Sequence, residues 1–224
     1  MTAPTRPAEE RAPLSAERVI DGAVGLADEI GIDAFTIRKL AEAIDVKPMT
    51  IYHHLPNKEA IIDGMVDRVF DEIDLPPTEL DWRAAMVVRC RSMRRVLADH
   101  PWASPLMESR TNPGPATLRH HDAVLGCLRL GGFSLGLTAH AYATIDAFLY
   151  GFALQEATLP ATGGAEMDEL AGSMVEAMPT DELPHLVEFT LDHVLQPGYE
   201  FSEAFEFGLG VILDGLQHAV DAES

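Results

Sequence analysis

Apolar residues recur at intervals of three and four along almost the whole chain, which is the period of a helix with one buried face. Proline, glycine and other turn residues interrupt this pattern repeatedly. No stretch reads as a convincing strand and no segment repeats, so the predicted fold class is all-α. The predicted helices cover residues 15–30, 37–44, 47–54, 58–73, 81–99, a short turn at 102–109, 116–130, 137–159, one or two weaker helices within 166–195, and 202–220.

Several predicted helix ends carry their own local signal. Ser15, Thr36 and Asn57 precede helical stretches, and such side chains accept a backbone N–H of the first turn. Gly31 follows the first helix at the position where a left-handed residue ends many helices. The start of the chain, residues 1–14, is polar and rich in proline, so we expect a disordered arm there.

Residues 35–61 predict a short helix, a tight turn, a second short helix and the start of a long third one. The second short helix would expose Thr50, Tyr52, His53 and His54. Lysines stand on either side of it, at positions 47 and 58. This is the layout of a helix-turn-helix whose second helix enters the major groove of DNA.

The formal net charge of −20 argues against a nucleic-acid partner until its distribution is considered. No lysine or arginine follows Arg129, whereas residues 131–224 hold 16 of the 36 acidic residues. Residues 1–130 therefore carry 16 basic against 20 acidic side chains, and the balance turns positive between Thr36 and Lys58. A local basic patch is what phosphate contact requires, and it favours docking by the N-terminal end.

The helix-turn-helix residues resemble the DNA-binding domain of the tetracycline-repressor (TetR) family of bacterial regulators. The matching motifs are F-T-x-R-K-L-A from Phe35 and T-x-Y-x-H-L-x-x-K from Thr50. A looser similarity to the ligand-binding domain of the tetracycline-repressor branch follows, in DWRAAM, ADHPW and GGFS. The resemblance implies a DNA-binding domain over residues 15–60 and an effector-binding and dimerisation domain over residues 61–224.

The resemblance also implies roles for single residues. Thr36 would cap its helix, Met49 would touch a thymine methyl, and Tyr52 with its neighbours would bind phosphate. For Tyr52 and His54 the alternatives are packing on the next helix and a bond to a backbone carbonyl. The expected DNA-binding residues are Thr36, Arg38, Lys47, Pro48, Met49, Thr50, Tyr52, His53, His54 and Lys58.

One residue departs from the family pattern: Asp45 stands in the turn where the family usually has glycine. Such turns often need a left-handed backbone, and aspartate is one of the few other residues that adopt it. The departure is therefore compatible with the same turn.

In the larger domain, the resemblance implies a small-molecule pocket and a homodimer interface. The interface would use the helix from Leu137 and the last helix, which has a wide apolar surface. The alternative is that these helices are buried within the monomer. The apolar and glycine positions expected at the interface are Phe205, Gly208, Leu209, Ile212, Leu213, Gly215 and Leu216.

The pocket prediction rests on a gapped alignment with the tetracycline repressor. The expected effector-binding residues are Met93, Met107, Val124, Tyr142, Asp146 and Gln155, each of which has core packing as its alternative. The histidine and glutamate that hold magnesium–tetracycline in that repressor fall near Met107 and at Gln155. Neither is a good magnesium ligand, so we expect a different effector, no metal and no cofactor.

Other groups of reactive residues give weaker signals. Adjacent His120 and His121 would point to different sides of a helix and make a poor chelate. A second group, His185, Glu188, Asp192 and His193, is more typical of a solvated acidic face than of a metal site. Two cysteines, at positions 90 and 127, indicate buried reduced thiols rather than a metal motif or a disulfide framework.

No catalytic motif or membrane-spanning run is found, so we expect a cytoplasmic protein that is not an enzyme. The leading hypothesis is a ligand-responsive regulator, a repressor that a small molecule releases from a palindromic operator. The alternatives are a metal-responsive regulator and a helical small-molecule binding protein without a DNA function.

Overall fold

The structure, a computed structural model, describes residues 13–177, 179 and 181–223. Within these residues every regular element is a helix, and a single isolated bridge joins Gly163 and Glu200. The prediction of an all-α fold is confirmed. The helices are α1 Ala16–Ile30, α2 Ile37–Ala43, α3 Pro48–Tyr52, α4 Lys58–Asp71, α5 Trp82–Asp99, α6 Ser104–Met107, α7 Pro115–Leu130, α8 Leu135–Thr158, α9 Gly164–Ala177, α10 Pro184–Phe189, the π-helical turn η1 Thr190–Val194, and α11 Glu203–Glu223.

The helix ends follow the local signals in the sequence. Ser15, Thr36 and Asn57 each accept a backbone N–H from three residues further on, at 3.2, 3.2 and 2.8 Å. Gly31 ends α1 with φ at 75°. The helix expected over residues 47–54 is shorter, because the backbone tightens where the His53 N–H donates to the Thr50 carbonyl. Most of the expected arm, residues 1–12, lies outside the described residues.

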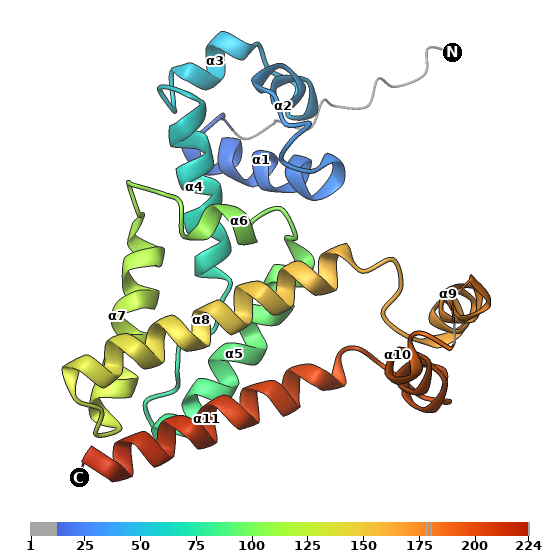
Figure 1. Cartoon of the computed structure of the whole chain (residues 1–224). Helices are drawn as coiled ribbons and strands as arrows, with labels where there is room; N and C mark the ends of the chain where they lie inside the picture. Colours follow the sequence, from blue (N-terminus) through green and yellow to red (C-terminus); the bar gives the residue numbers. More distant parts are fainter. Residues whose placement is uncertain (1–12, 178, 180, 224) are drawn as a thin grey trace, which may run out of the picture.

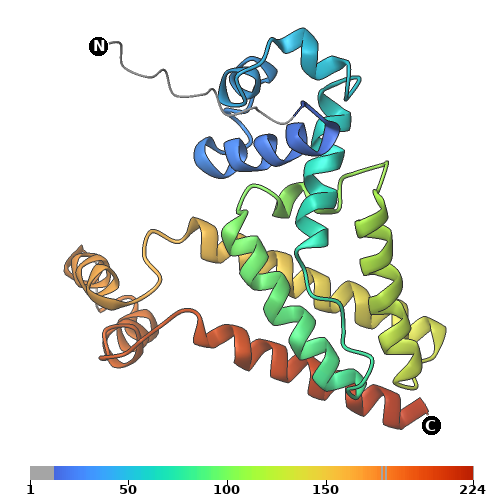
Figure 2. The same cartoon turned by 180° about the vertical axis from the view of Figure 1, so that it is seen from behind.

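Figure 1 shows the arrangement of three groups of helices. Helices α1 to α3 and the start of α4 form the upper group, while α5 to α8 and α11 form the larger lower body. Helices α9 and α10 project from one side of that body, and the view from behind in Figure 2 shows the same projection. No helix within the described ranges is long and apolar enough to cross a membrane.

Helix α4 belongs to both groups, because it packs against α1 above and against α7 below. Its apolar face, from Ile61 to Phe70, is buried over the whole length of the helix. Gly64 allows the close approach to α1, since a Cβ at this position would lie 2.5 Å from Ile20 Cδ1. Helix α4 therefore contacts both the upper group and the lower body.

The lower body places α8 between α5, α7 and α11. Phe205, Leu209 and Leu213, which were expected at a dimer interface, are fully buried in the core of the monomer. Gly208 does permit close helix packing, but within one chain: a Cβ there would lie 2.7 Å from Phe148 Cε2. The outward face of α11 instead carries Phe207 and Val211, which are 77% and 55% exposed.

Candidate DNA interface and effector site

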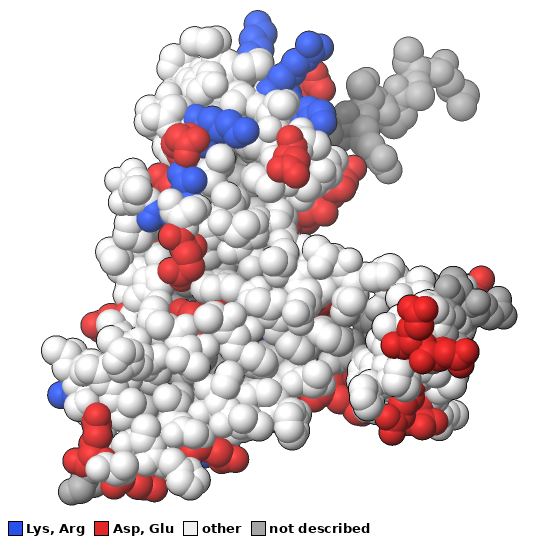
Figure 3. All heavy atoms as spheres, in the orientation of Figure 1, with Lys and Arg blue, Asp and Glu red and all other residues white. Residues whose placement is uncertain are grey.

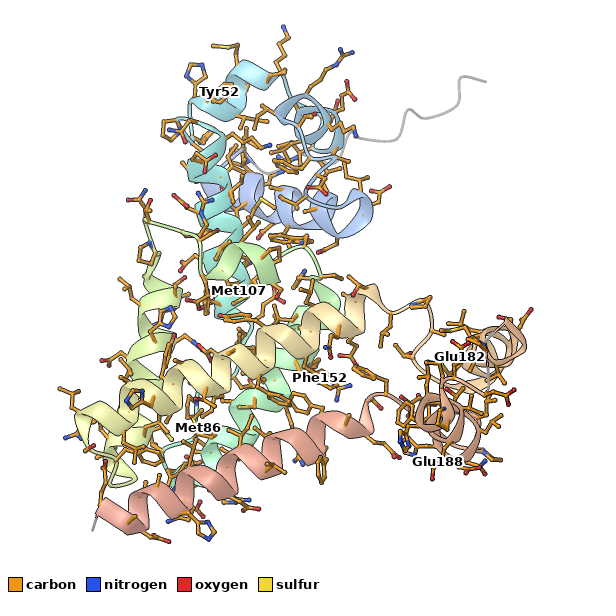
Figure 4. The ribbon with its side chains drawn as sticks, in the orientation of Figure 1. Tyr52, Met86, Met107, Phe152, Glu182 and Glu188 are labelled. Atoms are coloured by element: carbon orange, nitrogen blue, oxygen red, sulfur yellow. The ribbon has the colours of Figure 1, made fainter. Side chains whose placement is uncertain are left out.

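The short helix α3 is anchored by one residue and exposes most of the others. Ile51 is fully buried against the upper core, whereas Met49 is 69% exposed. Before α3, the turn is closed by Asp45 with φ at 55°, the left-handed conformation expected for it. Figure 4 shows Tyr52 at the upper end of the molecule, far from Phe152 in the lower body.

Basic side chains gather at the same end. Figure 3 shows most of the blue atoms on the upper group, around α2 and α3, whereas the charged atoms on the side lobe and along the lower rim are mainly red. Arg38, Lys39, Lys47 and Lys58 are the basic residues between residues 36 and 58, and none of them is buried. The basic patch that the sequence predicts between residues 36 and 58 therefore lies over the helix-turn-helix on this face of the molecule.

The ten expected DNA-binding residues form one group around α2 and α3, and none of them is buried. Thr36 and Lys58 also have structural roles. The Thr36 side chain caps α2, and Lys58 Nζ donates to the Phe35 carbonyl at 3.3 Å. Arg38 is paired with Glu42 at 3.1 Å but is 86% exposed, so phosphate can compete for it.

The expected effector-binding residues are only partly brought together. Met93, Met107, Val124 and Asp146 are buried in the lower body, and the half-buried Tyr142 is hydrogen-bonded to His121 Nδ1. Gln155 lies apart from them, exposed near the end of α8.

Arg89 and His120, which were not among the expected effector-binding residues, lie at the centre of this region. Arg89 is fully buried, and its Nη1 donates to Asp146 Oδ1 at 2.8 Å. Its Nε donates to His120 Nε2 at 3.2 Å. A signal was present, because Arg89 falls on the same helical face as Met86, Cys90 and Met93.

Burial dominates the protonation of these groups. It lowers the pKa of His120 to about 3, with the charge of Arg89 acting in the same direction. It raises the pKa of Cys90 to about 11 and, with the charges of Asp146 and Glu108, raises the pKa of Tyr142. All three side chains are therefore neutral near pH 7. Neither Cys90 nor the other cysteine is in a disulfide.

A cleft of about 140 Å³ opens between α4, α6 and α7, and it is lined by His121, the neighbour of His120 in the chain. Met107 and His121 lie in its wall, and Figure 4 places Met107 between the two groups of helices. Glu108, another wall residue, accepts a hydrogen bond from the Tyr150 hydroxyl at 2.9 Å. Hydrogen bonds thus join the cleft wall to two tyrosines of α8.

Comparison with known proteins decides the family. Residues 19–65 match the family described as "Bacterial regulatory proteins, tetR family", and residues 75–220 match "Tetracyclin repressor-like, C-terminal domain". The chain belongs to the TetR family. The match confirms the prediction of a helix-turn-helix. The protein is therefore a DNA-binding transcriptional regulator with a ligand-binding C-terminal domain.

Relatives of this TetR-family chain are themselves regulators. It is 32% identical to the tetracycline repressor protein class A from transposon 1721 of Escherichia coli, over 91% of this chain and 90% of that protein. It is 29% identical to the HTH-type transcriptional repressor DrrR1 of Streptomyces coeruleorubidus, over 91% and 77%. The Streptomyces coelicolor TetR family protein ActR, in a complex with actinorhodin, matches with a TM-score of 0.75 and 28% identity, over 93% and 99%.

Polar contacts join the DNA-binding helices of this TetR-family regulator to its ligand-binding body. Asp67 of α4 caps α7, accepting from the Thr117 backbone N–H at 2.8 Å and from its hydroxyl at 2.9 Å. The His100 ring nitrogens lie 2.7 Å from Asp28 of α1 and 3.1 Å from Glu72 at the end of α4. Although burial opposes the charge of His100, these two carboxylates raise its pKa.

The histidine groups considered as metal ligands do not form chelates. His120 and His121 bond different partners, and His185 lies 3.9 Å from Glu188 with both side chains exposed. Among the described residues no three histidine, cysteine, aspartate or glutamate side chains are grouped to hold a metal ion.

Proposed function

We propose that this TetR-family regulator is a repressor that a small molecule releases from a palindromic operator. The observation that carries the proposal is the division of the molecule. An exposed recognition helix lies at the basic end, a buried polar cluster lies within the lower body, and α4 packs against helices of both parts. Regulators of this kind act on the chromosome, so we propose a cytoplasmic location.

The outward faces of α8 and α11 favour a homodimer. Phe207 and Val211 of α11 and Leu154 of α8 are exposed, and a side chain at Gly151 would meet nothing within 4 Å. An apolar face with a small residue suits the close packing of two helix pairs. A two-fold dimer would place two α3 helices about 34 Å apart, which matches one turn of DNA.

The proposed effector is not magnesium–tetracycline. Met107 stands near the position of the repressor's metal-binding histidine, and Gln155 stands at the position of its glutamate. Gln155 is also exposed on α8. A thioether and an amide are poor replacements for magnesium ligands. ActR, which is similar over nearly its whole length, was crystallised with actinorhodin, so this architecture also accommodates a ligand other than tetracycline.

The proposed switch runs through α4. Asp63 and Val66 of this helix line the cleft, and Arg110 from the α6–α7 loop holds Asp63 at 2.6 Å and Glu59 at 2.7 Å. A ligand that enters beside these contacts favours one position of α4 over another. It shifts the equilibrium only by the difference between its affinities for the DNA-binding and released states.

A gel-shift titration with the DNA that flanks the gene tests the repressor proposal. We expect a salt-sensitive complex of one dimer on a palindromic site, unaffected by a chelator and by tetracycline with magnesium. Absence of any complex at low salt would favour the helical binding protein without a DNA function. A complex that forms only with added metal would favour the metal-responsive regulator.

A further inference from the structure

Three buried polar atoms at the centre of the lower body have no hydrogen-bond partner among the described residues. They are Arg89 Nη2, His120 Nδ1 and Asp146 Oδ2. Arg89 and His120 are fully buried and Asp146 is 5% exposed. Buried polar groups are nearly always satisfied, and three unsatisfied atoms on mutually bonded side chains indicate a missing partner.

The hydrogen bonds within the cluster determine whether each of the three atoms without a partner is a donor or an acceptor. Arg89 Nε always carries a hydrogen, so His120 Nε2 must be the acceptor in their 3.2 Å contact. A neutral imidazole that accepts at Nε2 carries its hydrogen at Nδ1. Arg89 and His120 therefore each offer a donor, and Asp146 Oδ2 offers an acceptor.

The cluster is connected both to the cleft and to the DNA-binding helices. His121 lines the cleft and is hydrogen-bonded to Tyr142, one helical turn before Asp146 on α8. The Phe70 ring of α4 lies 5.2 Å from the His120 ring and 5.3 Å from the His121 ring. A molecule bound at the cluster would therefore lie against α4, the helix that continues to the DNA-binding group.

Charge narrows the chemical class of that molecule. The positive charge of Arg89 and the negative charge of Asp146 balance each other, and Glu108 adds a carboxylate at the cleft. A strongly anionic ligand would be repelled by the carboxylates, and a cation would find only one open acceptor. In the neighbouring cleft, Val66 and Met107 supply an apolar wall for the rest of the molecule.

We propose that Arg89, His120 and Asp146 recognise the polar end of the effector, and that the effector is an uncharged hydroxylated carbonyl compound with an apolar body. Its carbonyl oxygen accepts from Arg89 Nη2 and His120 Nδ1, and its hydroxyl donates to Asp146 Oδ2. This inference rests on the proposed function, in that the occupant of the site is the effector. It requires no metal, in contrast to a chelated ligand.

Equilibrium dialysis with two matched pairs of compounds tests the inference without DNA. The pairs are 6-hydroxy-2-acetonaphthone with 2-acetonaphthone, and 3-hydroxybenzophenone with benzophenone, because in these compounds the hydroxyl cannot reach the carbonyl of its own molecule and stays free to donate. We expect the hydroxylated member of at least one pair to bind about tenfold or more tightly, because it adds a hydrogen bond to a buried charged group. Equal binding within both pairs, or binding of none of the four compounds, would overturn the inference.

Two variants assign the discrimination to the cluster. The double variant Arg89→Met/Asp146→Leu replaces the buried pair with apolar residues, a change that usually preserves folding. It should bind both members of the pair equally. The control Arg95→Met/Asp74→Leu removes an exposed pair that involves the same helix, separated by 3.7 Å, and should discriminate as the unmodified protein does.

Discrimination that persists in the double variant would mean that the cluster holds only buried water and does not recognise the ligand. The gel shift of the unmodified protein is scored separately. A protein that binds the hydroxylated compounds but no DNA contradicts the repressor function and leaves the assignment of the site standing. A protein that binds DNA but shows no preference within either pair contradicts the assignment alone.

Discussion

The substitution Asp146→Leu should be severely destabilising, because it leaves a buried guanidinium without its counter-ion. Arg89 has no exposed surface, and Asp146 Oδ1 accepts from its Nη1 at 2.8 Å. Burial opposes the charge of Arg89, but Asp146 outweighs this and raises the pKa of the guanidinium, which therefore stays charged. Removing one partner of such a buried pair costs about 3–5 kcal/mol, a large part of the roughly 5–15 kcal/mol that stabilises a typical domain.

Replacing both partners should cost far less. In Arg89→Met/Asp146→Leu no charge remains in the core, so we expect the free energy of unfolding to recover to within about 1–2 kcal/mol of the unmodified protein. The control variant is Asp214→Leu, which also removes the acidic partner of an ion pair. The Asp214–Arg83 pair is partly exposed, so this variant shows the cost of losing an ion pair without burial. That change should cost no more than about 1 kcal/mol.

Urea unfolding followed by circular dichroism measures all three variants. Protein concentration must be held constant, since the proposed dimerisation would contribute to the apparent stability. Two results would refute the reasoning: a loss below about 1 kcal/mol for Asp146→Leu, or a double variant no more stable than the single one. Either would mean that the guanidinium reaches another partner or water, and that the three open atoms are not buried together.

Four further outcomes can be measured. Lys47→Gln should weaken operator binding at low salt and reduce the slope of log affinity against log salt by about 0.9 for each phosphate that the variant no longer neutralises. Asp67→Ala should lower the free energy of unfolding by about 1 kcal/mol, measured by urea unfolding, because α7 is then without the side chain that caps it. Because the pKa of His120 falls from 6.5 to about 3 on folding, its contribution to stability is present above pH 6.5 and is lost on acidification; between pH 7 and pH 5 the unmodified protein should lose about 2 kcal/mol more than His120→Gln. Val211→Glu should convert the dimer to monomers in light scattering, whereas Leu130→Glu, at a residue 89% exposed on α7, should leave it intact.

Much of the fold follows from local features of the sequence. The period of apolar residues located the helices, and Ser15, Thr36 and Asn57 located three of their starts within one residue. The motif around α2 and α3 was recognisable because its apolar, polar and turn positions must agree in register. Even the unusual Asp45 could be interpreted, since only a few residues adopt a left-handed backbone.

The buried polar cluster proposed as the centre of the effector site was predicted less completely. Met93, Val124 and Asp146 are buried in the lower body, which fits core packing as well as a pocket, whereas Gln155 is exposed and the resemblance did not select Arg89 or His120. Arg89 does fall on the apolar face of α5, but the helix carries four other arginines, which made a solvated side chain the simpler interpretation. Its burial depends on an aspartate 57 residues further along the chain.

The last helix shows the same limit. Its sequence indicates a wide apolar surface, but periodicity does not say which part faces the monomer core. Packing against α8 decides this, because it buries Phe205, Leu209 and Leu213 and leaves Phe207 and Val211 exposed.

The sequence by itself therefore determined the helices, their caps, the DNA-reading motif and the segregation of charge, because neighbours along the chain encode each of these. Only the tertiary structure decided which part of the wide apolar surface of α11 faces the monomer core. It also decided which polar groups meet in the core, because those contacts join residues from α5, α7 and α8 whose pairing no local pattern specifies.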